Sequence, residues 1–202
     1  MTDKKRPYRK RRRAQLEAVT RRRITESAVE LHGTIGPSQT SVSAVAERAG
    51  VRRSTVYRHF RDEAALFDAC SAHWRAANPR PSLEDWAGIP DPDERLTAAL
   101  RELYGYYRCT ESMLANLLRD EERMPVVEEK FALFRDYLAS ARATLLRGRG
   151  VRGSARRRVG AAIGHALWFE TWRSLSREGL DDREAAELMC RLVAAAGARP
   201  SS

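Results

Sequence analysis

Apolar residues recur every three or four positions through most of the chain, which is the spacing of helices with one buried face. The clearest runs extend from Leu16 to Leu31, from Leu96 to Tyr107 and from Val127 to Leu145. No segment alternates apolar and polar residues over a useful length, as a half-buried strand would. The pattern therefore predicts an all-α fold with about nine helices.

The first third of the chain divides into four predicted helices, at residues 12–35, 41–48, 53–60 and 62–77. Gly36-Pro37 ends the first helix, and Ser41 is a good N-cap for the second. Residues 79–92 contain four prolines and no periodicity, so they are predicted to be a linker or irregular loop. Further helices are predicted at about 96–107, 112–122, 127–145, 155–176 and 182–196.

Charge changes the picture, because the whole net charge of +10 lies in the first 60 residues. They hold 15 lysines and arginines against five acidic residues, whereas residues 61–202 hold 22 of each kind. A basic segment beside a neutral remainder is typical of a nucleic-acid-binding module. A solubilising tail would explain Lys4 to Arg13 but not the helices that follow.

The two short helices within residues 41–60 have the layout of a helix-turn-helix. Gly50 stands where the tight turn needs a positive φ. Val56 and Phe60, four residues apart, are expected to pack inward. The side chains that then face outward or sideways are Arg53, Thr55, Tyr57 and His59. They can contact phosphates, base edges and thymine methyl groups.

Several motifs follow one another here without a gap. They are Ile24, Ala28, Leu31, Gly36, Thr40-Ser41-Val42, Ala46-Glu47-Arg48-Ala49-Gly50-Val51, Ser54-Thr55-Val56-Tyr57-Arg58-His59-Phe60 and Ala65-Leu66-Phe67. On these motifs the chain resembles the N-terminal domain of the TetR/AcrR family of transcription regulators. The resemblance implies that Arg53, Thr55, Tyr57 and His59 face DNA, together with Thr40. Arg52 and Arg58 are the further candidates for DNA binding. Thr40 is expected near a phosphate.

Two positions depart from the family pattern. Arg52 stands where members usually have a serine that caps the recognition helix, so that cap is lost or replaced. Glu63 stands where members usually have a lysine that touches the DNA backbone. Since a carboxylate repels phosphate, that contact is not expected here, and Arg61 is the candidate replacement.

The resemblance implies a repressor that leaves a palindromic operator when a small-molecule effector binds. The expected domains are a flexible basic arm (1–13), the helix-turn-helix domain (14–61), a connecting helix (62–78), the linker (79–92) and an effector-binding and dimerisation domain (93–202). The arm could follow the phosphate backbone or enter the minor groove. The alternative is a non-specific or architectural DNA-binding protein without an effector.

The family resemblance implies two roles for the C-terminal half, dimerisation and effector binding, and the sequence is compatible with both. The helices at about 155–176 and 182–196 carry much apolar surface. They are therefore expected to pack against the same two helices of a second copy in a homodimer. A monomeric core is the alternative. The candidates for an effector pocket are Trp74, Tyr104, Tyr107, Met113, Phe131, Phe134, Tyr137, His165 and Trp168. Most of them could equally be plain core, and the effector is unidentified.

Other functional classes find no support in the sequence. Residues 148–153 match G-x-G-x-x-G, but no strand precedes them, so a dinucleotide site is not expected. Cys70 and His73 share a helix face, but two ligands are too few for a metal. No cofactor and no enzymatic activity are expected. Three scattered cysteines and the absence of a signal peptide or membrane span indicate a cytoplasmic protein.

Overall fold

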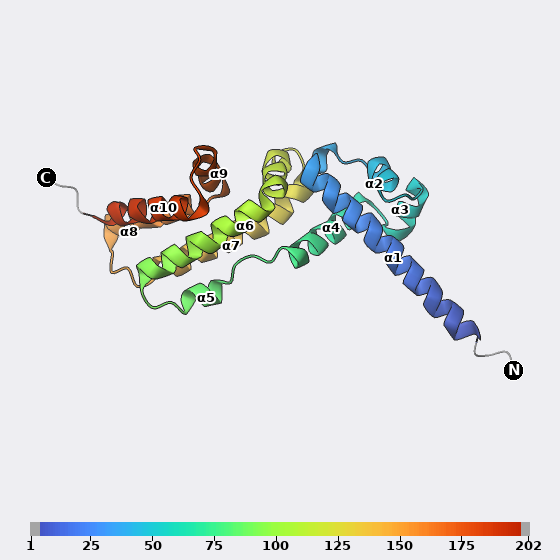
Figure 1. Cartoon of the computed structure of the whole chain (residues 1–202), viewed down its shortest axis with the longest axis horizontal. Helices are drawn as coiled ribbons and strands as arrows, with labels where there is room; N and C mark the ends of the chain where they lie inside the picture. The colour runs from blue at the N-terminus through green and yellow to red at the C-terminus, as the bar shows by residue number, and fades with distance from the viewer. Residues whose placement is uncertain (1–4, 199–202) are drawn as a thin grey trace. The chain divides into compact units, whose positions relative to one another are not determined.

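The structure is a computed structural model that describes residues 5–198, and within them it is all helical, as the sequence predicted (Figure 1). The helices are α1 (Lys5–Thr34), the 3-10 turn η1 (Pro37–Gln39), α2 (Val42–Arg48), α3 (Arg53–His59), α4 (Glu63–Ala77), α5 (Leu83–Ala87), α6 (Pro92–Glu121), α7 (Pro125–Leu146), α8 (Gly153–Ala166), α9 (Phe169–Arg177) and α10 (Asp182–Gly197). No described helix has both the length and the hydropathy of a membrane span.

The chain forms two compact units. The first comprises Met1–Asn78 and Ala115–Glu128, and the second comprises Pro79–Leu114 and Glu129–Ser202. The break after Asn78 coincides with the start of the expected linker. Residues 115–128, expected within the C-terminal domain, cluster instead with the N-terminal unit. Helices α6 and α7 therefore contribute residues to both units.

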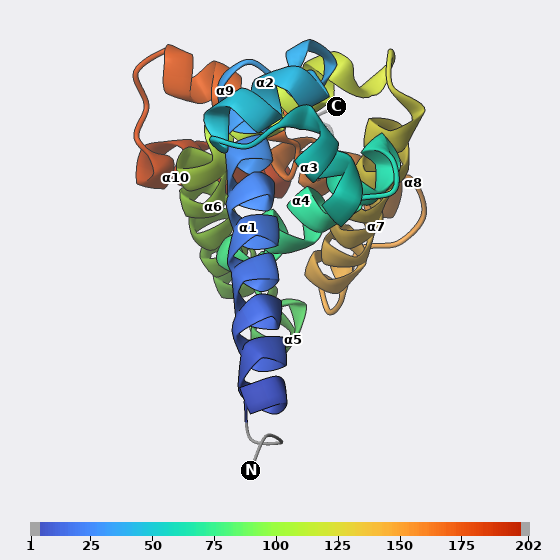
Figure 2. The same cartoon turned by 90° about the vertical axis from the view of Figure 1, so that its right-hand side faces the viewer.

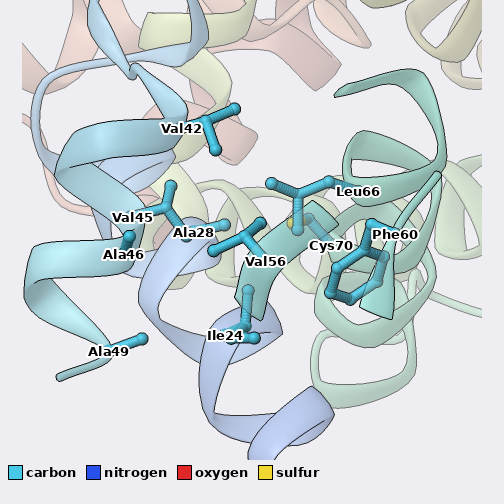
Figure 3. Packing of buried hydrophobic residues seen from close by; sticks show 10 residues of the cluster. All are labelled: Ile24, Ala28, Val42, Val45, Ala46, Ala49, Val56, Phe60, Leu66 and Cys70. Atoms are coloured by element: carbon cyan, nitrogen blue, oxygen red, sulfur yellow. The ribbon is translucent and has the colours of Figure 1, made fainter. Parts of the chain in front are cut away.

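The first unit has one apolar core, to which α1, α2, α3 and α4 all contribute (Figures 2 and 3). Its members are Ile24, Ala28, Val42, Val45, Ala46, Ala49, Val56, Phe60, Leu66 and Cys70. Figure 3 shows Val56 of α3 pointing toward Ala28 of α1 and Leu66 of α4. This packing explains why α3 needs an apolar residue every fourth position.

Helix α1 begins earlier than expected. Residues 5–13 are helical rather than an irregular arm, while residues 1–4 of the expected arm lie outside the described residues. Lysine and arginine favour the helix, and Pro7 stands in the first turn, where an amide has no helical partner. Leu16 and Val19 were expected on a buried face but are 61% and 62% exposed. The reason is that the buried part of α1 begins only at Ile24.

The second unit holds the antiparallel pair α8 and α10 together with parts of α6 and α7 (Figure 1). The helix expected at 155–176 is interrupted at Leu167–Trp168, which separates α8 from α9. At this break, the Tyr104 hydroxyl donates to the carbonyl of Ala166 at 2.8 Å. The Tyr107 hydroxyl donates to the carbonyl of Leu167. The two tyrosines satisfy carbonyls that a helix end would otherwise leave without partners.

Two further expectations were wrong. The gap expected between residues 107 and 112 is absent, because α6 runs unbroken from Pro92 to Glu121. Within it, the Thr110 hydroxyl donates to the carbonyl of Tyr106 at 2.6 Å, so this poor helix former is accommodated. The linker expected at 79–92 contains the short helix α5, which Ser82 caps by accepting from the amide of Asp85.

Candidate nucleic-acid interface

Helices α2 and α3 form a helix-turn-helix with well-satisfied ends. The Ser41 side chain caps α2 by accepting from the amide of Ala44 at 3.1 Å. Gly50 ends α2 with a φ of +61°, a value that glycine adopts without the strain other residues incur. The amide of Val51 then donates back to the carbonyl of Ala46 at 2.9 Å. The turn is therefore set by local hydrogen bonds, as the sequence predicted.

Helix α3 divides into a buried and an open face. Val56 and Phe60 are buried, as expected. Arg52, Arg53, Arg58 and Tyr57 are exposed, with Tyr57 at 40%, whereas Thr55 and His59 are half-buried. The open face therefore presents three guanidinium groups and one phenol, which suit phosphate and base-edge contacts. DNA contact by these residues stays a prediction.

Arg53 and Tyr57 act as a pair on the open face. The Arg53 guanidinium donates to the Tyr57 hydroxyl at 3.3 Å and lies 5.6 Å from the centre of its ring. This hydrogen bond raises the pKa of Arg53 above its ordinary value. The contact favours one arrangement of the two exposed side chains.

Arg52 occupies the N-cap of α3 without capping it through its side chain. This agrees with the expectation from the missing serine. An arginine has no acceptor to offer an amide, so it cannot replace the hydroxyl. Its side chain is exposed.

Thr40 and His59 are less available than expected. The Thr40 hydroxyl donates to the carbonyl of Gly36 at 2.8 Å, so it must rotate before it can donate to a phosphate. The Nε2 atom of His59 is buried and has no hydrogen-bond partner among the described residues. Burial, together with Arg58 and Arg21, lowers the pKa of His59, which favours a neutral imidazole at pH 7.

The structure adds one residue that the sequence did not single out. Arg21 of α1 places its guanidinium 4.1 Å from the centre of the Phe60 ring and donates to the carbonyl of His59. It thereby contacts the C-terminal end of α3. In the sequence Arg21 is one arginine among many in a basic run, and its partners lie 38 and 39 positions away, so no local pattern identifies it.

The second unit buries most of the candidate effector residues. Tyr104, Tyr107, Met113, Phe131 and Phe134 are buried, Tyr137 and Trp168 are half-buried, and His165 is exposed. Trp74 belongs to the first unit and is half-buried. The rings of Tyr107 and Phe134 lie 6.3 Å apart, and those of Phe131 and Phe134 lie 5.4 Å apart. These contacts make the cluster a packed aromatic core, and ligand binding there stays a prediction.

Among residues 5–198 there is no group of three or more side chains arranged to hold a metal ion. Cys70 faces the core of the first unit, where its thiol lies 3.9 Å from the carbonyl of Thr25. The expectation of core filler for this cysteine agrees with that position.

The geometry defines a helix-turn-helix protein of the all-α class. Comparison with known protein families narrows this class to one family: residues 24–70 match the family of bacterial regulatory proteins called tetR. This match over the N-terminal segment confirms the resemblance seen in the sequence. No curated protein sequence matches the chain.

Solved structures of TetR-family regulators share the fold. One is a TetR-like transcriptional regulator from Rhodococcus sp. RHA1, with 20% identity and a TM-score of 0.63 over 87% of this chain and 94% of that chain. Another is NalD of Pseudomonas aeruginosa, secondary repressor of the MexAB-OprM multidrug efflux pump, with 21% identity, a TM-score of 0.57 and coverage of 92% and 99%. The multidrug binding protein EbrR, complexed with imidazole, has 18% identity, a TM-score of 0.55 and coverage of 90% and 92%.

Proposed function

We propose that this protein is a sequence-specific transcription regulator that binds a palindromic operator as a homodimer. The observation that carries the proposal is the open face of α3, where Arg52, Arg53, Tyr57 and Arg58 are exposed while Val56 and Phe60 anchor the helix. A face of this kind, on the second helix of a helix-turn-helix, suits the major groove.

The homodimer would form through α8 and α10. The dimer was predicted from the apolar surface of α8, α9 and α10, but much of that surface packs within the second unit. Val159, Ile163, Phe169 and Trp172 are all buried there. Leu192 of α10 remains 50% exposed, and Leu188 and Trp168 are half-buried. These three residues are the surface that we assign to the dimer.

Release from DNA would follow effector binding in the second unit. We place the effector in the aromatic cluster around Tyr107 and Phe134, whose packed rings would have to move apart to admit an apolar ligand. Helix α6 carries Tyr107 and continues past Leu114 into the first unit, so a shift of this helix could reach the DNA-binding elements. A ligand that favours one position of α6 would then shift the population of DNA-binding forms. Repression is the direction that we propose.

Selection from random duplex DNA at near-physiological salt, with competitor DNA present, tests this function. An enriched palindrome, with half-site centres about one helical turn apart (~34 Å) or a multiple of that distance, is the expected result. Binding without enrichment would support the alternative, a non-specific or architectural DNA-binding protein. Sedimentation of the same preparation at micromolar concentration should show a dimer, and a monomer would exclude the proposed interface.

A further inference from the structure

A small cavity, partly open to solvent, lies in the first unit. Its volume is about 140 Å³. Five segments line it: the end of α1, the 3-10 turn η1, the start of α2, the first turns of α4 and the turn between α6 and α7. Its principal lining residues are His32, Val42, Val45, Phe67, Met124 and Val126. Most of the wall is therefore apolar, and Thr40, Ser41, Glu63 and His32 supply its polar groups.

The volume suits one small ring. A water molecule takes up about 30 Å³ in the liquid, and a dry apolar cavity of about 150 Å³ can hold a benzene molecule. The apolar part of the wall gives water few partners, so a carbon ring placed against that part is favoured over water.

His32 is one of the polar residues that line the cavity. The centre of its ring lies 5.3 Å from the centre of the Phe67 ring. Burial lowers the pKa of His32 to about 4, although the nearby Asp120 carboxylate acts in the opposite direction. The imidazole is therefore neutral at pH 7 and offers one donor and one acceptor.

One charged group restricts the ligand. Glu63, which departs from the family pattern, also lines the cavity. Its carboxylate would repel an anion. The site should therefore discriminate against aromatic carboxylates and favour a neutral ring.

We propose that this cavity binds a single-ring aromatic molecule with one uncharged hydrogen-bonding group, of the phenol class, whose polar group pairs with the His32 imidazole. The ligand would contact Val42 of α2 and Met124 of the α6–α7 turn at once. It would thus fix the start of the helix-turn-helix against that turn. Binding itself does not depend on the proposed regulatory function.

The test is titration of the full-length protein with phenol, toluene and benzoate in the absence of DNA, followed by amide and methyl NMR shifts. Phenol should bind most tightly, toluene next and benzoate least. Shifts should centre on Val45, Leu66 and Val126. Failure of phenol to bind at millimolar concentration, or shifts confined to the second unit, would overturn the proposal whatever the DNA selection gives.

Variants sharpen the assignment. Val126→Phe should fill the cavity from its half-buried rim and weaken phenol binding at least about tenfold, because the ring then competes for the same space. Leu133→Phe adds similar bulk at an exposed position of the second unit and should leave binding unchanged. His32→Phe should reduce phenol affinity to that of toluene, roughly fivefold, through the lost hydrogen bond. Unchanged phenol affinity in both cavity variants would contradict the site. If Val126→Phe does not fold, NOEs between phenol and the Val45 methyl groups in the unmodified protein decide the question.

Discussion

The guanidinium of Arg21 stacks over the ring of Phe60, with 4.1 Å between the guanidinium carbon and the ring centre. The same group donates to the carbonyl of His59, the last residue of α3. A cation near a helix C-terminus interacts favourably with the helix dipole. Arg21 therefore joins α1 to the end of the proposed recognition helix and stabilises its position.

Replacing Arg21 should weaken specific DNA binding by changing how α3 is held. Arg21→Met should lower the free energy of unfolding by about 1 kcal/mol, the scale of one exposed cation–π contact and one hydrogen bond. It should also lower the ratio of operator to random-DNA affinity, measured by fluorescence anisotropy. Arg23→Met, at an exposed site of α1, is the matched control for charge. Equal specificity ratios in the two variants would show that Arg21 acts only through its charge.

The open face of α3 should be essential for operator binding. Tyr57→Ala and Thr55→Ala should abolish measurable binding while leaving the dimer intact, because they remove contacts that α3 would make in the groove. Tyr57→Phe separates the roles of ring and hydroxyl, since it keeps the ring but removes the acceptor for Arg53. Electrophoretic mobility shifts and sedimentation measure the two properties. Operator binding retained by both alanine variants would refute the assignment of α3.

His32 should make the protein less stable in mild acid. A histidine whose folded pKa is about 4 and whose ordinary value is 6.5 must be neutral in the folded state. The stability that depends on this neutrality is present above pH 6.5 and is lost as pH falls toward 4. Loss of up to about 3 kcal/mol is expected over this range. Urea unfolding at pH 7, 5.5 and 4 should show a shallower pH dependence in His32→Phe than in the unmodified protein; equal slopes would contradict the burial of this imidazole.

Asp120 should stabilise the first unit. Burial alone would raise the pKa of this carboxyl, but hydrogen bonds from Arg119 and Ser38 outweigh it and lower the pKa. The amide of Ser38 donates to Asp120 at 2.9 Å. Asp120→Ala should therefore cost about 2 kcal/mol, because it leaves that amide without its partner. The exposed neighbour Glu122 provides the control in Glu122→Ala, which should change the free energy of unfolding by less than about 0.5 kcal/mol.

The basic start of the chain should act through charge alone. Removing residues 1–13 should weaken binding to all DNA sequences and reduce the slope of log K against log salt, because phosphate contacts release counterions. Salt titrations of full-length and truncated protein compare the slopes. An unchanged slope would mean that this segment does not touch DNA.

Local signals predicted the helix-turn-helix well, whereas tertiary contacts decided the rest. Ser41, Gly50 and the spacing of Val56 and Phe60 set α2 and α3 through neighbours in sequence. The break between α8 and α9 contains no proline, and the glycine nearest to it, Gly164, lies within α8. The groups that satisfy the carbonyls at the break are tyrosines of α6, far away in the sequence. The cavity could not be predicted from the sequence either, since Val45 and Met124 line the same space only in the folded chain.

The first unit is discontinuous in sequence, and this limits how the protein can be dissected. The Asn116 amide donates at 3.0 Å to the carbonyls of both His32 and Gly33, and Arg119 donates at 2.8 Å to that of Ile35. These residues complete the end of α1 from more than 80 positions away. A fragment cut after Asn78 would keep every residue of the helix-turn-helix yet leave those carbonyls open to water. Helix α1 of the fragment would fray from its C-terminal end. The isolated fragment is therefore a poor substitute for the whole chain in DNA-binding experiments.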